Sequence, residues 1–100
     1  MDNKIVVTGI GIMSCLGSSV EEFWKALKNG KSGIRQISQV DPNLFPCKVS
    51  GEVKDFIPRD WMGPKEAKRM GRFSQLAVAA SKIAVDQSDF LGKVDPSRIG

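Results

Sequence analysis

An apolar run near the front of the chain, residues 5–10, limits the fold more than any other segment. It reads Ile-Val-Val-Thr-Gly-Ile and lacks the alternation of apolar and polar residues that marks a half-exposed strand. Such a continuous run is typical of a strand that is covered on both faces in a parallel sheet. Because Gly9 and Gly11 carry no side chain, we expect another segment to pack closely against their backbone.

A helix start follows this run. Ser18 and Ser19 each stand three residues before a glutamate, Glu21 and Glu22, which is the spacing of a capping box. The next apolar residues recur at the helical spacing i, i+3, i+4 and i+7, and they are Val20, Phe23, Trp24 and Leu27. The Asn-Gly pair at 29–30 ends the helix. Strand and helix together predict a βα unit at the front of the chain.

The middle of the chain predicts connecting segments and one short helix. Residues 31–47 have the composition of a loop, and 49–53 form a candidate short strand that Gly51 interrupts. Pro64 is acceptable at the first position of a helix and opens a basic helical turn. Gly71 ends that turn.

Residues 72–87 predict the second long helix. Its apolar face is slim because the helix holds four alanines, and a slim face lets a helix approach a neighbouring backbone closely. The residues of that face are Phe73, Leu76, Ala77, Ala80, Ile83 and Ala84. A new strand is expected to begin at Arg98. The order strand, helix, strand, paired helices and strand predicts an α/β fold with a largely parallel sheet.

The composition favours a globular protein in a reducing compartment. Hydrophobic residues make up 41% and charged residues 26% of the 100 residues, which excludes a disordered chain. No apolar run reaches the roughly 18 residues of a membrane-spanning helix, so no membrane association is expected. Cys15 and Cys47 are far apart and suit neither a disulfide framework nor a zinc site. We therefore expect a cytoplasmic protein, and because a strand is only beginning at Arg98, we expect the front part of a longer one.

The sequence contains no complete catalytic or cofactor-binding motif. Gly9-x-Gly11 is followed by Ser14 where the dinucleotide fingerprint requires a third glycine, and Gly30-Lys31-Ser32 follows a helix where a phosphate-binding loop must follow a strand. The chain contains no histidine, so Cys15 cannot form a cysteine–histidine pair and is interpreted as a small buried thiol in a turn. No metal site is predicted, because the chain has neither histidines nor a tight cluster of carboxylates.

A basic cluster is the one surface feature with a functional interpretation. Lys65, Lys68 and Arg69 fall at i, i+3 and i+4 and share one helical face, which would attract an anionic partner. Taken alone, such a cluster is more often a solvated helix face. Nucleic acid is disfavoured as the partner, because no aromatic residues interleave with the charges and the net charge is only +4.

Four segments together resemble the front of a β-ketoacyl-[acyl-carrier-protein] synthase of the type II, elongating class. They are VVTGIGIMSCLGSSVEEFWKALKNGKSGI, GEVKDF, KEAKRMGRFSQLAVAASKIAVDQS and DPSRIG. The resemblance implies a thiolase-like fold of two similar α/β halves in layers, usually in a homodimer. Residues 1–100 would be the first part of the N-terminal half, incomplete and without an internal boundary.

The resemblance also implies a function. Family members condense acyl-carrier protein with malonyl-carrier protein by decarboxylative Claisen condensation, in fatty-acid biosynthesis. Their Cys-His-His set would lie beyond this segment, so no catalytic residue is expected within 1–100. The substrates ride on the phosphopantetheine arm of acyl carrier protein, and no other cofactor is implied. The first strand and its exit turn, Cys15 included, then become scaffolding.

Carrier proteins are acidic, and the resemblance places Lys65, Lys68 and Arg69 in the basic patch that docks them. Gly71 departs from the family pattern, where Asp is common, which puts the geometry beside this patch in doubt. Three alternatives stay open at this point. They are a polyketide-type ketosynthase, a non-catalytic protein like a chain-length factor, and a segment that only binds carrier protein.

Overall fold

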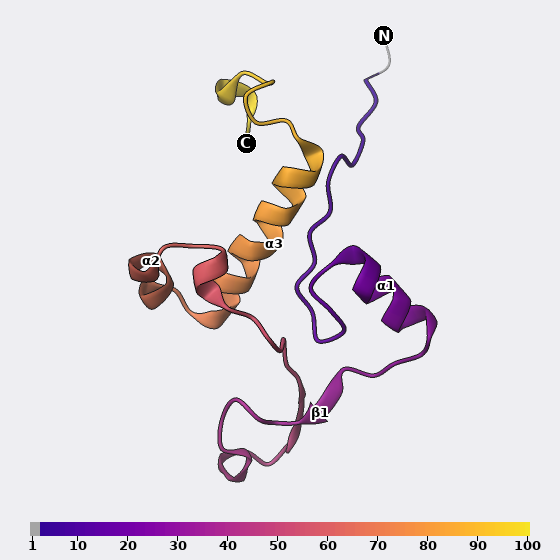
Figure 1. Ribbon diagram of the computed structural model, residues 1–100, viewed down its shortest axis with the longest axis vertical. Helices are drawn as coiled ribbons and strands as arrows, with labels where there is room; N and C mark the ends of the chain where they lie inside the picture. Colours follow the sequence, from indigo (N-terminus) through magenta and orange to yellow (C-terminus); the bar gives the residue numbers. More distant parts are fainter. Residues whose placement is uncertain (1–2) are drawn as a thin grey trace. The chain divides into compact units, whose positions relative to one another are not determined.

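The computed structural model describes residues 3–100 and divides the chain into two compact units (Figure 1). The hairpin unit comprises residues 12–57, and the helical unit comprises the segment up to Gly11 together with residues 58–100. Both units are defined by packing within this chain. The prediction that residues 1–100 contain no internal domain boundary stays a prediction.

The hairpin unit contains the predicted first helix, α1 (Val20–Lys28). Ser19 is its N-cap, and the Ser19 hydroxyl accepts a hydrogen bond from the backbone N–H of Glu22 at 3.2 Å. The Glu22 carboxylate accepts in return from the N–H of Ser18 at 3.1 Å, so the box closes one residue earlier than the cap itself. Gly30 then adopts a φ of +66°, a conformation that favours glycine. The predicted start and end of this helix are confirmed.

Two short strands complete the hairpin unit. β1 (Ile34–Gln36) pairs antiparallel with β2 (Val49–Gly51), with Ile34 opposite Gly51. The candidate strand at 49–53 is therefore confirmed in its first three residues. The assignment of 31–47 to a loop was wrong at residues 34–36, which form β1. The sequence did not reveal this strand because all three of its residues are exposed and show no alternation of apolar and polar residues.

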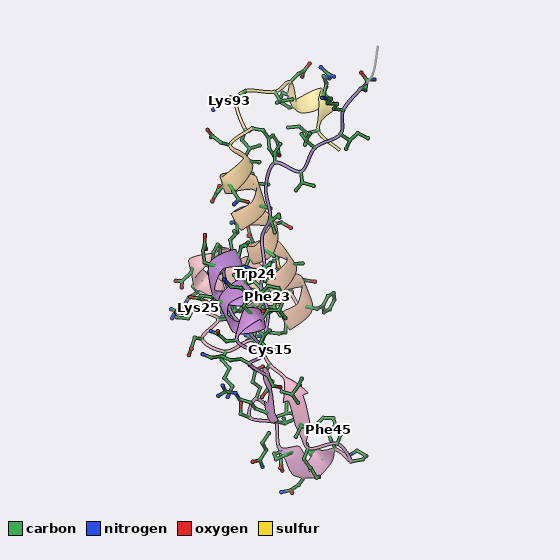
Figure 2. All side chains as sticks on the ribbon, turned by 90° about the vertical axis from the view of Figure 1, so that its right-hand side faces the viewer. Cys15, Phe23, Trp24, Lys25, Phe45 and Lys93 are labelled. Atoms are coloured by element: carbon green, nitrogen blue, oxygen red, sulfur yellow. The ribbon has the colours of Figure 1, made fainter. Side chains whose placement is uncertain are left out.

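The connection between β1 and β2 is closed by polar contacts. It contains a 3₁₀ turn, η1 (Pro42–Leu44), and the Lys48 ammonium donates to the carbonyl oxygens of Pro42 at 2.7 Å and Phe45 at 2.5 Å. Figure 2 shows Phe45 at the end of the hairpin away from α1. At the other end of the connection, the Glu52 carboxylate accepts from the N–H groups of Ser38 and Gln39, each at 2.9 Å. These bonds, led by that from the Ser38 backbone, lower the pKa of Glu52 below its ordinary value.

The helical unit contains the other two predicted helices, α2 (Pro64–Arg69) and α3 (Arg72–Ser88). A 3₁₀ turn, η2 (Pro58–Asp60), precedes α2, and another, η3 (Pro96–Arg98), follows α3. Asp89 ends α3 in the left-handed conformation, with a φ of 52°. Both helices are confirmed, whereas the strand predicted to begin at Arg98 was wrong, since Arg98 lies in η3.

The apolar run at residues 5–10 does not form a strand in the described part of the chain. A strand needs a hydrogen-bonding neighbour, and within residues 3–100 the run has none, so Ile5 is 99% exposed. The run lies along α3 instead (Figure 1), where the N–H of Ile10 donates to the Gln87 side chain at 2.6 Å. The prediction that this strand is covered on both faces was wrong for residues 3–100.

The predicted close approach at the two glycines is confirmed, and α3 is the segment that approaches. A Cβ atom built on Gly9 would overlap the carbonyl oxygen of Ala84, and one built on Gly11 would overlap that of Ala80. Both alanines belong to the slim face of α3. Glycine is therefore required at both positions by space.

The sheet and the core of residues 3–100 are both small. The sheet in this part of the chain has two antiparallel strands, so the parallel sheet predicted from the sequence is not found there. Ala26, Met62 and Ala79 are the buried apolar residues. Phe73, which was predicted on the packed face of α3, is 81% exposed. No helix in the described residues is both long and apolar enough to cross a membrane.

Candidate docking surface

The basic residues singled out in the sequence lie together on α2. Lys65 follows Pro64 at the helix start, while Lys68 and Arg69 lie in its last turn. Their spacing places them on one side of the helix, which we call the basic face. All three are exposed, and within residues 3–100 their side chains form no ion pair. The structure therefore brings the three predicted residues together on one exposed surface.

The electrostatics of the basic face favour an acidic partner. Glu66 is the one carboxylate of α2, and Asp60 in η2 is the nearest one earlier in the sequence. Neither neutralises the basic face through an ion pair in the described part of the chain. Exposed cations that are free of internal partners raise the local potential and can attract a negatively charged protein.

Contacts from outside α2 hold this short helix in place. Near its C-terminal end, the carbonyl oxygen of Ala67 accepts a hydrogen bond from the Gln75 side chain of α3 at 2.9 Å. Just before its start, the Trp61 carbonyl accepts from the Lys82 ammonium, which also belongs to α3. Met62, between these points, is buried. Sequence reasoning missed Gln75 and Lys82, because no spacing pattern connects them to α2.

Gly71 joins α2 to α3 without distortion. It is the N-cap of α3, with a φ of −69° and a ψ of 162°, which any residue can adopt. No side chain caps the helix there, because glycine has none. A Cβ at this position would come within 3.1 Å of the Phe73 ring, which is exposed and able to move. Gly71 therefore leaves α3 without a side-chain cap. It does not separate the two helices, because the hydrogen bond from Gln75 to Ala67 still connects them.

Cys15 lies in a turn, as expected, but its burial was wrongly predicted. The turn is closed by backbone hydrogen bonds between Ser14 and Gly17, and Cys15 at its tip is exposed. Its sulfur lies close to the backbone of Gly33 and Gly51, which have no side chains that would overlap it. The thiol borders a cleft of about 480 Å³ in the hairpin unit. Since the chain contains no histidine, no cysteine–histidine pair can form at this cleft.

The described residues also hold no candidate metal site. No group of three or more His, Cys, Asp or Glu side chains in residues 3–100 is placed to bind an ion. The basic face on α2, which was predicted from the sequence and is exposed in the structure, is therefore the candidate functional site.

The sequence of this chain is similar to those of known β-ketoacyl synthases. Residues 2–100 match the family model described as the β-ketoacyl synthase N-terminal domain. A 3-oxoacyl-[acyl-carrier-protein] synthase 2 from Synechocystis sp. is 36% identical over 98 residues, which cover 97% of this chain and 24% of that protein. A β-ketoacyl synthase 1 from Streptomyces violaceoruber, named for the granaticin polyketide, is 37% identical over 101 residues, covering 100% of this chain and 24% of that protein.

A solved structure shows the same likeness in three dimensions. The ishigamide ketosynthase/chain length factor matches with a TM-score of 0.75 and 37% identity. The match covers 95% of this chain and 23% of that one. The described residues thus have the fold of the corresponding ketosynthase segment. The chain spans about a quarter of the length of the curated relatives it matches.

Proposed function

This chain belongs to the β-ketoacyl synthase family, in the N-terminal domain, and on that premise we propose that the intact protein is a condensing acyltransferase. Its substrates are an acyl group and a malonyl group, each carried as a thioester on acyl carrier protein. The observation that carries the role of this segment is the exposed basic face on α2, whose three cations have no ion-pair partner in residues 3–100.

The proposed role of α2 is to dock acyl carrier protein. Lys65, Lys68 and Arg69 would face acidic side chains of the partner across a solvated interface. Each exposed ion pair contributes roughly 0.2–1 kcal/mol, so three of them steer and orient the partner without binding it tightly. Weak docking suits a carrier that must leave after each transfer. The relatives named 3-oxoacyl-[acyl-carrier-protein] synthase 2 support this choice of partner.

The chemistry itself belongs to groups outside residues 1–100. A cysteine thiolate attacks the acyl thioester, and the carrier thiol leaves. Malonyl-carrier protein then loses carbon dioxide, and its carbanion attacks the enzyme-bound thioester, which releases the cysteine and forms a β-ketoacyl-carrier protein. Two histidines would support decarboxylation, and this chain contains none. The phosphopantetheine arm of the carrier supplies the thiol, and we propose no further cofactor.

We place the enzyme in fatty-acid biosynthesis, in the cytoplasm and as a homodimer. Support for the pathway comes from relatives in Synechocystis and Vibrio harveyi named 3-oxoacyl-[acyl-carrier-protein] synthase 2, at 36% and 39% identity. A polyketide-type ketosynthase is the second candidate, favoured by the granaticin relative at 37% identity. A non-catalytic protein like a chain-length factor is a third candidate, supported by the likeness to the ishigamide ketosynthase/chain length factor.

A condensation assay with the intact protein tests the proposed function. Malonyl-carrier protein labelled at the free carboxyl is mixed with acyl-carrier protein, and we expect labelled carbon dioxide and a β-ketoacyl product two carbons longer. A fatty-acid enzyme should prefer simple saturated acyl groups. Absence of both products from a folded protein that still binds carrier protein would contradict the catalytic assignment and favour a chain-length-factor-like partner.

A further inference from the structure

We propose that Gln75 is a positioning residue for the docking helix, and that Lys82 assists it. This inference rests on the proposed function, since it explains how the basic face is held ready for carrier protein. Neither residue belongs to the basic face. Both extend from α3 to carbonyl oxygens in or next to α2.

A helix as short as α2 needs outside support. It has six residues, fewer than two turns, and an isolated helix of that length is not stable in water. Its last carbonyl groups also lack partners within the helix. The spacing of Lys65, Lys68 and Arg69 on one face exists only while α2 keeps its helical form. The basic face therefore depends on whatever holds these six residues in place.

Gln75 supplies that support at Ala67, between the basic residues. The N–H of Ala67 donates to the Gly63 carbonyl at 2.9 Å, and its carbonyl accepts from Met70 at 3.3 Å and from Gln75 at 2.9 Å. The bond from Gln75 is partly buried, which strengthens it relative to an exposed contact. The Gln75 backbone is itself fixed in the first turn of α3 by its bond to Gly71 at 3.1 Å.

Lys82 provides a second attachment at the start of the same segment. Its ammonium donates to the carbonyl of Trp61, which lies between η2 and α2. Gln75 and Lys82 are seven residues apart and therefore lie on one face of α3, separated by roughly 10 Å along its axis. One attachment thus precedes α2 and the other reaches its C-terminal half. Together they fix the direction of the helix as well as its position.

The affinity for carrier protein depends on the fraction of molecules in which α2 holds its three cations in the binding-competent arrangement. If α2 loses an attachment, the binding-competent arrangement of its three cations is present for a smaller fraction of the time. The apparent affinity for carrier protein falls by that same fraction. A single hydrogen bond shifts such an equilibrium by a factor of about two to ten. We expect a loss of carrier affinity about threefold, because Lys82 still holds the other end.

The test is Gln75→Leu in the intact enzyme, a change that keeps the side chain's bulk and removes its N–H donor. The KM for acyl-carrier protein should rise about threefold, while kcat stays constant. The KM for the same acyl group on coenzyme A, which has no carrier protein to dock, should not change. Gln87→Leu is the matched control. It removes the hydrogen bond to Ile10 from the same helix, at a point remote in sequence from α2, and should leave both KM values unchanged.

Two results would overturn the inference. Equal rises in both KM values would show a general structural defect, and an unchanged KM for acyl-carrier protein would show that Gln75 does not position the basic face. The double variant Lys65→Glu/Lys68→Glu separates this inference from the proposed function. If it raises the carrier KM while Gln75→Leu does not, positioning by Gln75 fails and docking stands. If neither variant raises it, docking on α2 fails as well.

Discussion

Reversing the charge of Lys65 and Lys68 together should raise the KM for acyl-carrier protein about tenfold at low ionic strength, with kcat unchanged. Each substitution by glutamate removes an attraction and adds a repulsion toward an acidic partner. Both side chains are exposed and unpaired within residues 3–100, so folding stability should change little. Steady-state kinetics with varied acyl-carrier protein measures the effect.

The matched control for this experiment lies on α1. Lys25 and Lys28 have the same spacing, are also exposed, and change the net charge equally when replaced by glutamate. Lys25→Glu/Lys28→Glu should leave the carrier KM within about twofold, because neither lysine belongs to the basic face. The difference between the two double variants should shrink as salt is added. Equal rises for both would mean that net charge, and not the basic face, governs the KM.

Gly11→Ala should destabilise the intact enzyme by about 3 kcal/mol. A Cβ atom at this position would overlap the carbonyl oxygen of Ala80 and lie 3.0 Å from the backbone nitrogen of Ala84. Both atoms belong to the backbone of α3, which cannot rotate away as a side chain can. The helix or the apolar run must therefore shift. Urea unfolding of the intact enzyme, compared with the wild type, measures the loss.

Gly63→Ala is the control for this substitution. Gly63 has a φ of −65°, and a Cβ there would meet its nearest neighbour, the Glu66 carboxyl carbon, only at 4.0 Å. Its cost should not exceed about 1 kcal/mol, the loss expected when alanine occupies an N-cap. A cost at Gly11 as small as that at Gly63 would contradict the close approach of residues 9–11 to α3.

The helices could be predicted from the sequence because their signals are local. Ser19 and Glu22 form the cap that their spacing indicates, and Pro64 opens α2 as its fixed φ allows. The close approach at Gly9 and Gly11 was also predicted, and α3 proved to be the partner. Membership of the β-ketoacyl synthase family, inferred from four segments, is confirmed by the match over residues 2–100.

The strands were predicted less well because a strand depends on its neighbours. The run at 5–10 has the composition of a buried strand, yet within residues 3–100 it has no pairing partner. β1 was missed because its three residues are exposed and its pairing with β2 is set by the closure of the hairpin. The surroundings of Cys15 likewise include Gly33 and Gly51, which are distant in sequence. Such contacts leave no periodic signal.

The candidate site likewise combines features that local spacing predicts with contacts between segments that are distant in sequence. The spacing of Lys65, Lys68 and Arg69 was sufficient to place them on one face, and the structure shows that face exposed. The contributions of Gln75 and Lys82 could not be predicted, because they arise only when α3 lies against the backbone of α2.

Crosslinking tests docking on α2 most directly. A photoreactive phenylalanine analogue replaces Lys68 in the intact enzyme, and a second variant carries it at Lys28 on α1. Both are irradiated with acyl-carrier protein at low ionic strength, and covalent adducts are identified by mass. Docking on the basic face predicts an adduct from position 68 that salt suppresses, and little or none from position 28. An adduct from position 28 alone, or equal adducts from both positions, would contradict it.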